Sequence, residues 1–224
     1  MDAFAWAQDA AARLEGEFGP RLSFVGLQGS RARGEATETS DIDLVVLVDD
    51  LCADDLGVYR RVIEFMPHAE LACGFVGSSA VLENWPRHEL FQFVNDTVSV
   101  CGRLPFSPAD FTRDDACEAA RIGASGIYHA ICHALVFDGE ARADILRELA
   151  KSAVFVLQAL HFARTGAYLR TRTELAGVLE GMDAEVLEWA IRAKGMSELA
   201  ADDARKLASL LLDWSSAIIL AGNA

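Results

Sequence analysis

The sequence predicts a protein of two parts: an α/β domain, with a mixed sheet flanked by helices, followed by an α-helical bundle. Up to about residue 101, apolar stretches typical of strands alternate with segments of helical spacing. Pro105 and Pro108 then interrupt the pattern, and strand signals largely cease beyond them. We therefore place the domain boundary near residue 106, which divides the chain into 1–105 and 106–224.

The first part begins with a helix and continues as alternating strands and helices. Phe4, Ala7, Ala11 and Leu14 recur at helical spacing and predict a helix over 2–17. Pro67 ends a second helical pattern. The remaining predicted elements are strands over 22–27, 41–48, 69–76 and 97–101, a short helix after Gly29, and a helix over 56–66.

The second part reads as helices throughout. Residues 150–161 are apolar all round, which is too hydrophobic for a surface helix and predicts a central position in the bundle. The predicted helices cover 114–137, 140–165, 172–179, 184–193 and 197–220.

Composition indicates a globular protein and disfavours a nucleic-acid partner. The chain has 224 residues, of which 52% are hydrophobic and 24% charged, and its formal net charge is −14. Nucleic-acid binders normally carry a basic patch, so this charge argues against broad phosphate-backbone contacts.

The N-terminus carries acid where a signal peptide needs base, and no apolar run reaches membrane-spanning length. The five cysteines form no Cys-x-x-Cys pair, which favours a reducing, cytoplasmic compartment over a disulfide framework or zinc site.

One segment carries a pattern suited to a metal-bound triphosphate. Gly29 and Ser30 stand where a predicted strand turns into a helix, so backbone N–H groups and a hydroxyl would face an anion there. Asp41 and Asp43 open the next strand, and residues two apart on a strand share a face. One or two carboxylates, completed by substrate phosphates and water, are the usual Mg²⁺ arrangement. Taken separately, Gly-Ser is also an ordinary turn and Asp-x-Asp an ordinary strand entry.

In this order the two motifs resemble the signature of the nucleotidyltransferase superfamily that includes DNA polymerase beta. The pattern is Gly-Ser, a spacer and Asp-x-Asp, and the spacer here, residues 31–40, has the length found in minimal and antibiotic nucleotidyltransferases. The resemblance implies a nucleotidyltransferase-type sheet and Mg²⁺-dependent transfer, with two ions, of a nucleoside monophosphate from ATP or another nucleoside triphosphate. It also implies that Asp41 and Asp43 bind metal and that Gly29 and Ser30 bind phosphate.

Four further residues near the motif are candidates for the site. Two-metal phosphoryl transfer generally uses a third carboxylate on a neighbouring strand, and Glu70 opens the third predicted strand, although a solvated strand-end glutamate would look the same. Arg31 and Arg33 could clamp phosphate oxygens or pair with Glu35 and Glu38. Ser40 could bind a phosphate, but support of the loop fits its position better.

The helical part offers Lys151 and two histidines. Lys151 starts the apolar helix; it either snorkels to solvent or, as in relatives whose helical domain closes over the nucleotide, contacts the triphosphate. His129 and His133 are spaced i, i+4 without a third ligand, which favours a structural role. Helix order resembles the bundles of HEPN and kanamycin-nucleotidyltransferase proteins. Seven residues separate Arg121 from His129, a departure from the HEPN ribonuclease pattern.

The sequence thus predicts an enzyme that transfers a nucleoside monophosphate to a hydroxyl of a small, antibiotic-like molecule or of a protein, and releases pyrophosphate. The expected partners are a nucleoside triphosphate and this acceptor, with no nucleic acid and no membrane, and a homodimer is possible. Two other functions remain open. One is a nucleotide-binding regulator or antitoxin without turnover, and the other is an interaction scaffold built on the helical part.

Overall fold

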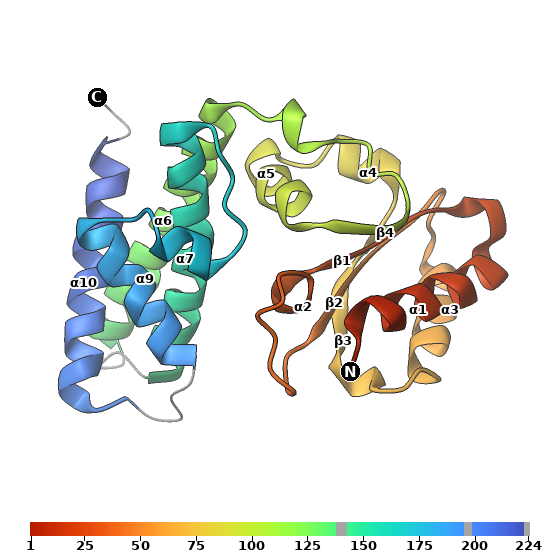
Figure 1. Ribbon diagram of the computed structural model, residues 1–224, viewed down its shortest axis with the longest axis horizontal. Helices are drawn as coiled ribbons and strands as arrows, with labels where there is room; N and C mark the ends of the chain where they lie inside the picture. The colour runs from red at the N-terminus through yellow and green to blue at the C-terminus, as the bar shows by residue number, and fades with distance from the viewer. Residues whose placement is uncertain (138–142, 195–198, 222–224) are drawn as a thin grey trace. The chain divides into compact units, whose positions relative to one another are not determined.

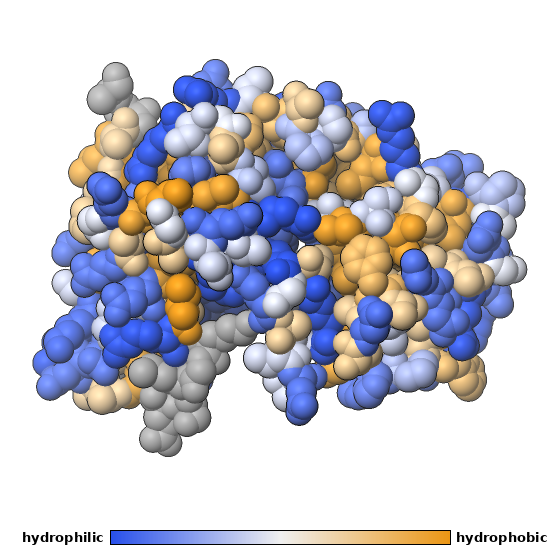
Figure 2. Space-filling view, viewed as in Figure 1, coloured by the Kyte–Doolittle hydropathy of each residue, from blue (hydrophilic) through white to orange (hydrophobic). Residues whose placement is uncertain are grey.

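A computed structural model describes residues 1–137, 143–194 and 199–221, and it divides into two compact units, Met1–Asp110 and Phe111–Ala224. The division falls a few residues after the boundary that the sequence suggested. The predicted helix starts at residues 140 and 197 lie outside the described residues. On the face drawn in Figure 2, hydrophilic and apolar residues are interspersed over both units.

The N-terminal unit is a four-stranded mixed sheet with helices on both faces (Figure 1), as predicted. Asp2 caps its first helix by accepting hydrogen bonds from the N–H groups of Phe4 and Ala5. In chain order the elements are α1 (Ala3–Phe18), η1 (Gly19–Arg21), β1 (Leu22–Gln28), α2 (Gly29–Ala32), β2 (Ile42–Val48), α3 (Ala53–Glu64), η2 (Ala69–Leu71), β3 (Ala72–Gly77), α4 (Ser79–Glu83), α5 (Arg87–Asp96), β4 (Val98–Gly102) and η3 (Pro108–Asp110).

The strand order is β3-β2-β1-β4. β1 runs antiparallel to both β2 and β4, while β2 and β3 are parallel. β2 is therefore central, and its first residues lie between the end of β1 and the start of β3. This arrangement places the two halves of the sequence motif side by side.

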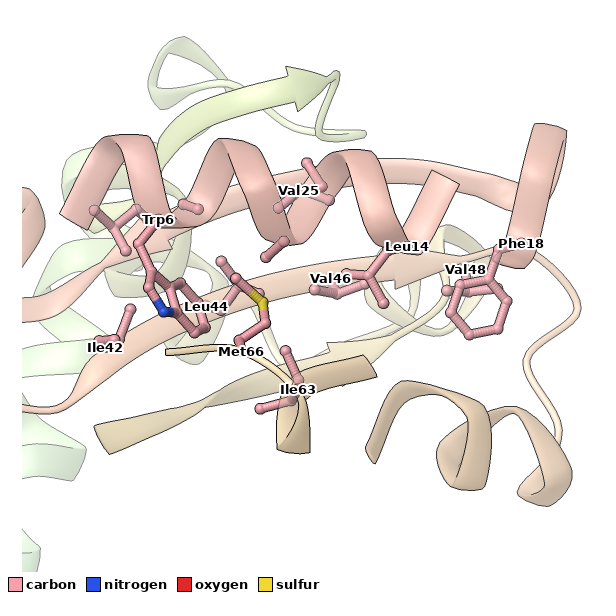
Figure 3. Packing of buried hydrophobic residues seen from close by; sticks show 14 residues of the cluster. Trp6, Leu14, Phe18, Val25, Ile42, Leu44, Val46, Val48, Ile63 and Met66 are labelled. Atoms are coloured by element: carbon pink, nitrogen blue, oxygen red, sulfur yellow. The ribbon is translucent and has the colours of Figure 1, made fainter. Parts of the chain in front are cut away.

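One face of the sheet packs on α1 and α3. Alternate residues of β2, namely Ile42, Leu44, Val46 and Val48, are buried there with Leu14 and others from the helices (Figure 3). Removing this apolar surface from water supplies the main stabilisation of the unit. The Trp6 indole also donates a hydrogen bond to the Pro67 carbonyl, which ties α1 to the turn after α3.

The opposite face is covered by α4 and α5, two helices that the sequence analysis did not assign. Phe75 on β3 makes edge-to-face ring contacts with Trp85, which follows α4, and with Phe93 on α5. The odd-numbered residues of β2 point to this face, because side chains alternate along a strand. Asp43 is the first of them, so α5 and the carboxylate share one side of the sheet.

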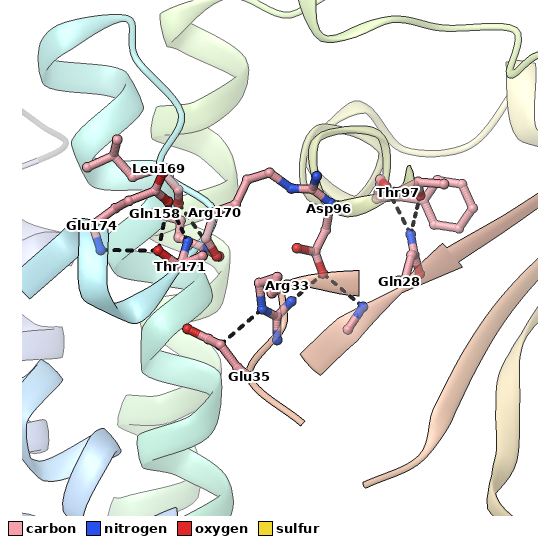
Figure 4. Close-up of polar contacts among 12 residues, drawn as sticks. Gln28, Arg33, Glu35, Asp96, Thr97, Gln158, Leu169, Arg170, Thr171 and Glu174 are labelled. Carbon is pink, nitrogen blue, oxygen red and sulfur yellow. Dashed lines mark hydrogen bonds and ion pairs between the residues drawn. The ribbon is translucent and has the colours of Figure 1, made fainter. Parts of the chain in front are cut away.

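Helices are the only regular secondary structure among the described residues of the C-terminal unit. Gln158, fully buried on α7, donates hydrogen bonds to the carbonyls of Leu169 and Arg170, and Thr171 and Glu174 form a capping box at the start of α8 (Figure 4). The helices are α6 (Arg113–Phe137), α7 (Ala143–Thr165), α8 (Arg172–Ala176), α9 (Gly181–Lys194) and α10 (Ala201–Ala221). Among the described residues, no helix has the length and apolar character needed to cross a membrane.

Candidate functional site

The Gly-Ser turn and the Asp-x-Asp strand meet through the antiparallel pairing of β1 and β2. Gln28 at the end of β1 pairs with Asp43, so Gly29 lies against the Asp43 side chain. A Cβ at position 29 would overlap the Asp43 carboxylate oxygen Oδ2, and Gly29 has φ +69°. Both the space and the left-handed backbone require glycine here. The motif is therefore one structural unit rather than two independent turns.

Asp43 lies on one face of β2, and Asp41 stands one residue before this strand, which begins at Ile42 and not at Asp41 as predicted. Ile42 between them is fully buried on the opposite side, while Asp41 is exposed and Asp43 is half-buried. Two such carboxylates at the accessible start of an inner strand match the donor set that Mg²⁺ takes together with phosphate oxygens and water. The residues present thus fit one divalent cation bound jointly with a triphosphate.

The predicted place of Glu70 at the start of a strand is wrong, while its role as a third metal ligand remains a prediction. β3 begins only at Ala72, and Glu70 lies in the preceding turn of 3-10 helix. His68, with φ +60°, sets this turn, and the Glu70 side chain is 72% exposed with Oε1 3.8 Å from His68 Nδ1. Among the described residues, no group of three or more His, Cys, Asp or Glu side chains is arranged to hold a metal ion.

Cys73 occupies the strand position beside Asp43. The parallel register of β2 and β3 pairs these two residues, and paired residues of neighbouring strands point to the same face. Cys73 is exposed. The neighbour of the motif on β3 is therefore a thiol and not a carboxylate.

Arg31 and Ser40 shape the loop between the two halves of the motif. The Arg31 guanidinium donates to the carbonyls of Ser40, at 3.0 and 2.5 Å, and of Asp41, at 3.0 Å. The Ser40 hydroxyl accepts from the Thr37 N–H at 2.9 Å. Ser40 thus supports the loop, and the guanidinium holds the backbone that delivers Asp41 to its place. Phosphate contacts by these two residues remain predictions.

Arg33 is buried in a polar cluster instead of facing outward. Its guanidinium, on a side chain only 8% exposed, donates to Asp96 Oδ2 at 2.5 Å and to Glu35 at 3.3 Å (Figure 4). Burial by itself lowers the pKa of Arg33, but Asp96 and Glu35 outweigh burial and raise the pKa above its ordinary value. These bonds use the Nε and Nη1 groups of Arg33, and a phosphate contact by this residue remains a prediction.

Asp96 is a site residue that sequence reasoning missed. It ends α5, is 5% exposed, and accepts a hydrogen bond from the Gly29 N–H at 3.3 Å in addition to the bond from Arg33. Nearby, Gln28 donates to Thr97 at 2.6 Å and to the Phe93 carbonyl at 2.9 Å. These contacts fasten the end of α5 to the Gly-Ser turn. Leu90, Phe91 and Val94, spaced as on a helix, are the signal that could have found α5 and its final acid.

The candidate residues of the helical unit have surface environments. Lys151 lies on α7 with its side chain 63% exposed and its ammonium 3.8 Å from a Glu148 oxygen. The rings of His129 and His133 on α6 are 6.3 Å apart between centroids, and no metal-binding group includes them within the described residues. The triphosphate contact of Lys151 remains a prediction.

Comparison with known proteins agrees with the motif. Residues 14–67 match the family described as "Nucleotidyltransferase domain", and this stretch contains β1, α2 and β2. The matched stretch lies within the N-terminal unit, and the family is the one that the motif resembles. No curated protein matches the chain. A solved structure titled "Crystal structure of the toxin-antitoxin with AMP-PNP" is 18% identical, with a TM-score of 0.31, over 59% of this chain and 96% of that one.

Proposed function

We propose that this protein is a Mg²⁺-dependent nucleotidyltransferase that moves a nucleoside monophosphate from ATP or another nucleoside triphosphate to an acceptor hydroxyl. The acceptor oxygen forms a bond to the α-phosphorus, the bond from that phosphorus to the bridging oxygen breaks, and pyrophosphate leaves. The hydroxyl proton passes to solvent or to a base on the acceptor side. The observation that carries the proposal is the joint placement of Gly29 and the Asp43 carboxylate, within the stretch that matches the family.

In this proposal each part of the motif has its own task. The N–H groups and the hydroxyl at Gly29 and Ser30 bind the outer phosphates, and the missing side chain at Gly29 lets a phosphate come close to the backbone. Asp41 and Asp43 hold the cation, which neutralises charge on the phosphates when bound. Catalysis comes from positioning and charge neutralisation, so no covalent nucleophile is needed. The acceptor is a small molecule or a protein side chain.

A second candidate is a nucleotide-binding regulator without turnover. It is favoured by Cys73, because a thiol stands beside Asp43 where a third carboxylate would complete a two-ion site. The two functions differ in pyrophosphate release. The enzyme releases pyrophosphate when acceptor is present, whereas the regulator binds the triphosphate with Mg²⁺ and leaves it intact.

The test replaces the carboxylates one at a time. We expect Asp41→Asn and Asp43→Asn to lose Mg²⁺-dependent nucleotide binding in calorimetric titrations and to lose transfer of labelled nucleotide to acceptors in cell extract. Loss of the exposed Asp41 carboxylate from a like-charged pair should leave the thermal unfolding midpoint unchanged or slightly raised. Asp49→Asn, an exposed acid just after the other end of β2, is the matched control. Full activity in both motif variants would refute the metal assignment.

A further inference from the structure

We propose that the nucleotide site of this chain holds a single divalent cation, on Asp41 and Asp43, and offers no protein ligand for a second. The inference rests on the proposed function and concerns the donor set around Asp43. A second ion about 3.5–4 Å from the first needs at least one more carboxylate within reach of both.

On the β3 side, geometry leaves one position that could serve. Ala72 packs with the core on the far face of the sheet. Gly74 has φ +130°, and a Cβ there would overlap the Leu44 carbonyl, so no side chain is tolerated. Phe75 is engaged with the rings of Trp85 and Phe93. Cys73, paired with Asp43 and exposed on the same face, is the remaining position.

The thiol of Cys73 is a poor substitute for a carboxylate. Mg²⁺ is a hard cation that takes oxygen ligands, whereas cysteine suits soft metals as a thiolate. Cys73 therefore leaves the second position without a ligand for the metals that accompany nucleoside triphosphates.

On the β1 side, the polar residues near Asp43 are already engaged in holding the fold. Gln28, the antiparallel partner of Asp43, donates its amide to Thr97 and Phe93. Asp96 accepts from Gly29 and from Arg33, and moving its Oδ2 onto a metal would leave a buried guanidinium without this partner. Glu70 belongs to the β3 side, in the turn before that strand. Its side chain is 72% exposed and lies beside His68.

In a two-ion site the metal ions both bind the triphosphate and activate the acceptor hydroxyl. In a one-ion site the ion serves only the triphosphate. The cation on Asp41 and Asp43 serves the triphosphate, and no protein-held ion stands beside the attacking oxygen to lower the pKa of the acceptor hydroxyl. Activation of that hydroxyl then depends on a base that belongs to the acceptor or lies in its pocket.

The experiment counts bound ions directly. The full chain is dialysed against Mn²⁺ and a triphosphate analogue that cannot be cleaved between the α- and β-phosphates, with equal nucleotide on both sides. The excess of Mn²⁺ on the protein side is divided by bound nucleotide. We expect one ion for each nucleotide in the wild-type protein. Two ions would overturn the inference and leave the proposed function standing, whereas no bound nucleotide and no ion would overturn both.

Variants at position 73 then test the cause. Cys73→Asp supplies the missing carboxylate on an exposed strand position, and we expect the count to rise from one to two. Cys73→Ser, which adds no charge, is the matched control and should stay at one, as should Glu70→Gln. An unchanged count in Cys73→Asp, with nucleotide still bound, would show that this residue does not set the number of ions and would overturn the assignment.

Discussion

At the scale of single residues, Gly29 carries the strictest requirement in the site. Its positive φ serves the turn from β1 into α2, and the missing side chain makes room for the Asp43 carboxylate. Asp96 fixes the same turn through the Gly29 N–H. Gly29 is therefore constrained in three ways: by its backbone conformation, by the nearby Asp43 carboxylate and by its hydrogen bond to Asp96.

We expect Gly29→Ala to lower both stability and nucleotide binding. The left-handed backbone alone costs a non-glycine residue about 1–2 kcal/mol, and the new methyl group displaces the Asp43 carboxylate. Chemical denaturation and calorimetric titration with Mg²⁺ and nucleotide measure the two losses.

Gly16→Ala is the matched control for this change. Gly16 lies in α1, and a Cβ there meets nothing within 4 Å. Alanine should raise the free energy of unfolding by about 0.5–1 kcal/mol, without any effect on nucleotide affinity. Equal behaviour of the two variants would contradict the special role of position 29.

The sequence predicted the residues of the motif but not the residues that support them. Gly29, Ser30, Asp41 and Asp43 stand out because their spacing and flanking strands form a local pattern. Asp96 contacts Gly29 from 67 positions away, and no local pattern encodes such a pairing. In the sequence Arg31 and Arg33 looked alike, each able to bind phosphate or to pair with Glu35 or Glu38, because burial is a property of the folded chain; the structure pairs Arg33 with Glu35.

At the scale of elements, α3 shows how one ion pair secures a helix start. Asp55 accepts from the Cys52 N–H at 2.9 Å as part of a capping box, and its two oxygens also meet the Arg21 guanidinium at 2.7 and 3.0 Å. The hydrogen bonds from Arg21 and Cys52 hold the pKa of the Asp55 carboxyl well below its ordinary value. The pair joins α3 to the turn that enters β1.

This shift makes stability depend on acid pH. Because the folded pKa of Asp55 lies below the unfolded value of about 3.9, its contribution is fully present above that value and is lost as pH falls through the folded pKa. We expect Asp55→Asn to be less stable than the wild-type protein at neutral pH, with the difference shrinking as the pH is lowered below about 4. Denaturant titrations at several pH values measure this.

Asp54→Asn, one residue earlier in the same helical turn, is the control for the pH dependence. Asp54 is exposed, so its replacement should change the free energy of unfolding less than Asp55→Asn does. If the difference in free energy of unfolding between the wild-type protein and Asp55→Asn stayed constant down to low pH, it would contradict the ion-pair explanation.

Predictions succeeded where the ends of a helix or strand were placed correctly and failed where they were not. Long periodic patterns such as that of α1 were found to within about a residue, and the mixed sheet with flanking helices is as predicted. The start of β3 was misplaced because His68 adopts a left-handed conformation and η2 takes up residues with strand-like composition. That displacement removed Glu70 from the sheet. α4 and α5 were missed between two recognised strands.

At the scale of the whole molecule, the chain consists of two units, each with its own buried apolar residues. The motif lies entirely in the first unit, together with its supporting residues Asp96 and Gln28. Any contribution of the helical unit to nucleotide binding therefore has to be tested separately.

Lys151 is the candidate for such a contribution. If its ammonium contacts the triphosphate, Lys151→Met should weaken triphosphate binding about tenfold or more, as expected for a charge-assisted hydrogen bond, and leave nucleoside binding nearly unchanged. Calorimetric titration with both ligands measures the difference. Lys206→Met, an exposed lysine on α10, is the control. Unchanged triphosphate affinity in Lys151→Met would contradict a contact between Lys151 and the triphosphate, and the helical unit would then serve another purpose.

The bonds from Asp96 to Gly29 and Arg33 also constrain the order in which the protein assembles. They span 67 and 63 positions, and the bond from Gln28 to Thr97 spans 69. Contacts of such separation form late, since the loop between them must close first. During synthesis the Gly-Ser turn and β2 leave the ribosome well before α5 does. A chain cut short before residue 96 would carry the complete motif but would lack the carboxylate that binds Gly29 and Arg33. Competence to bind nucleotide should therefore arrive only after the end of α5 has emerged.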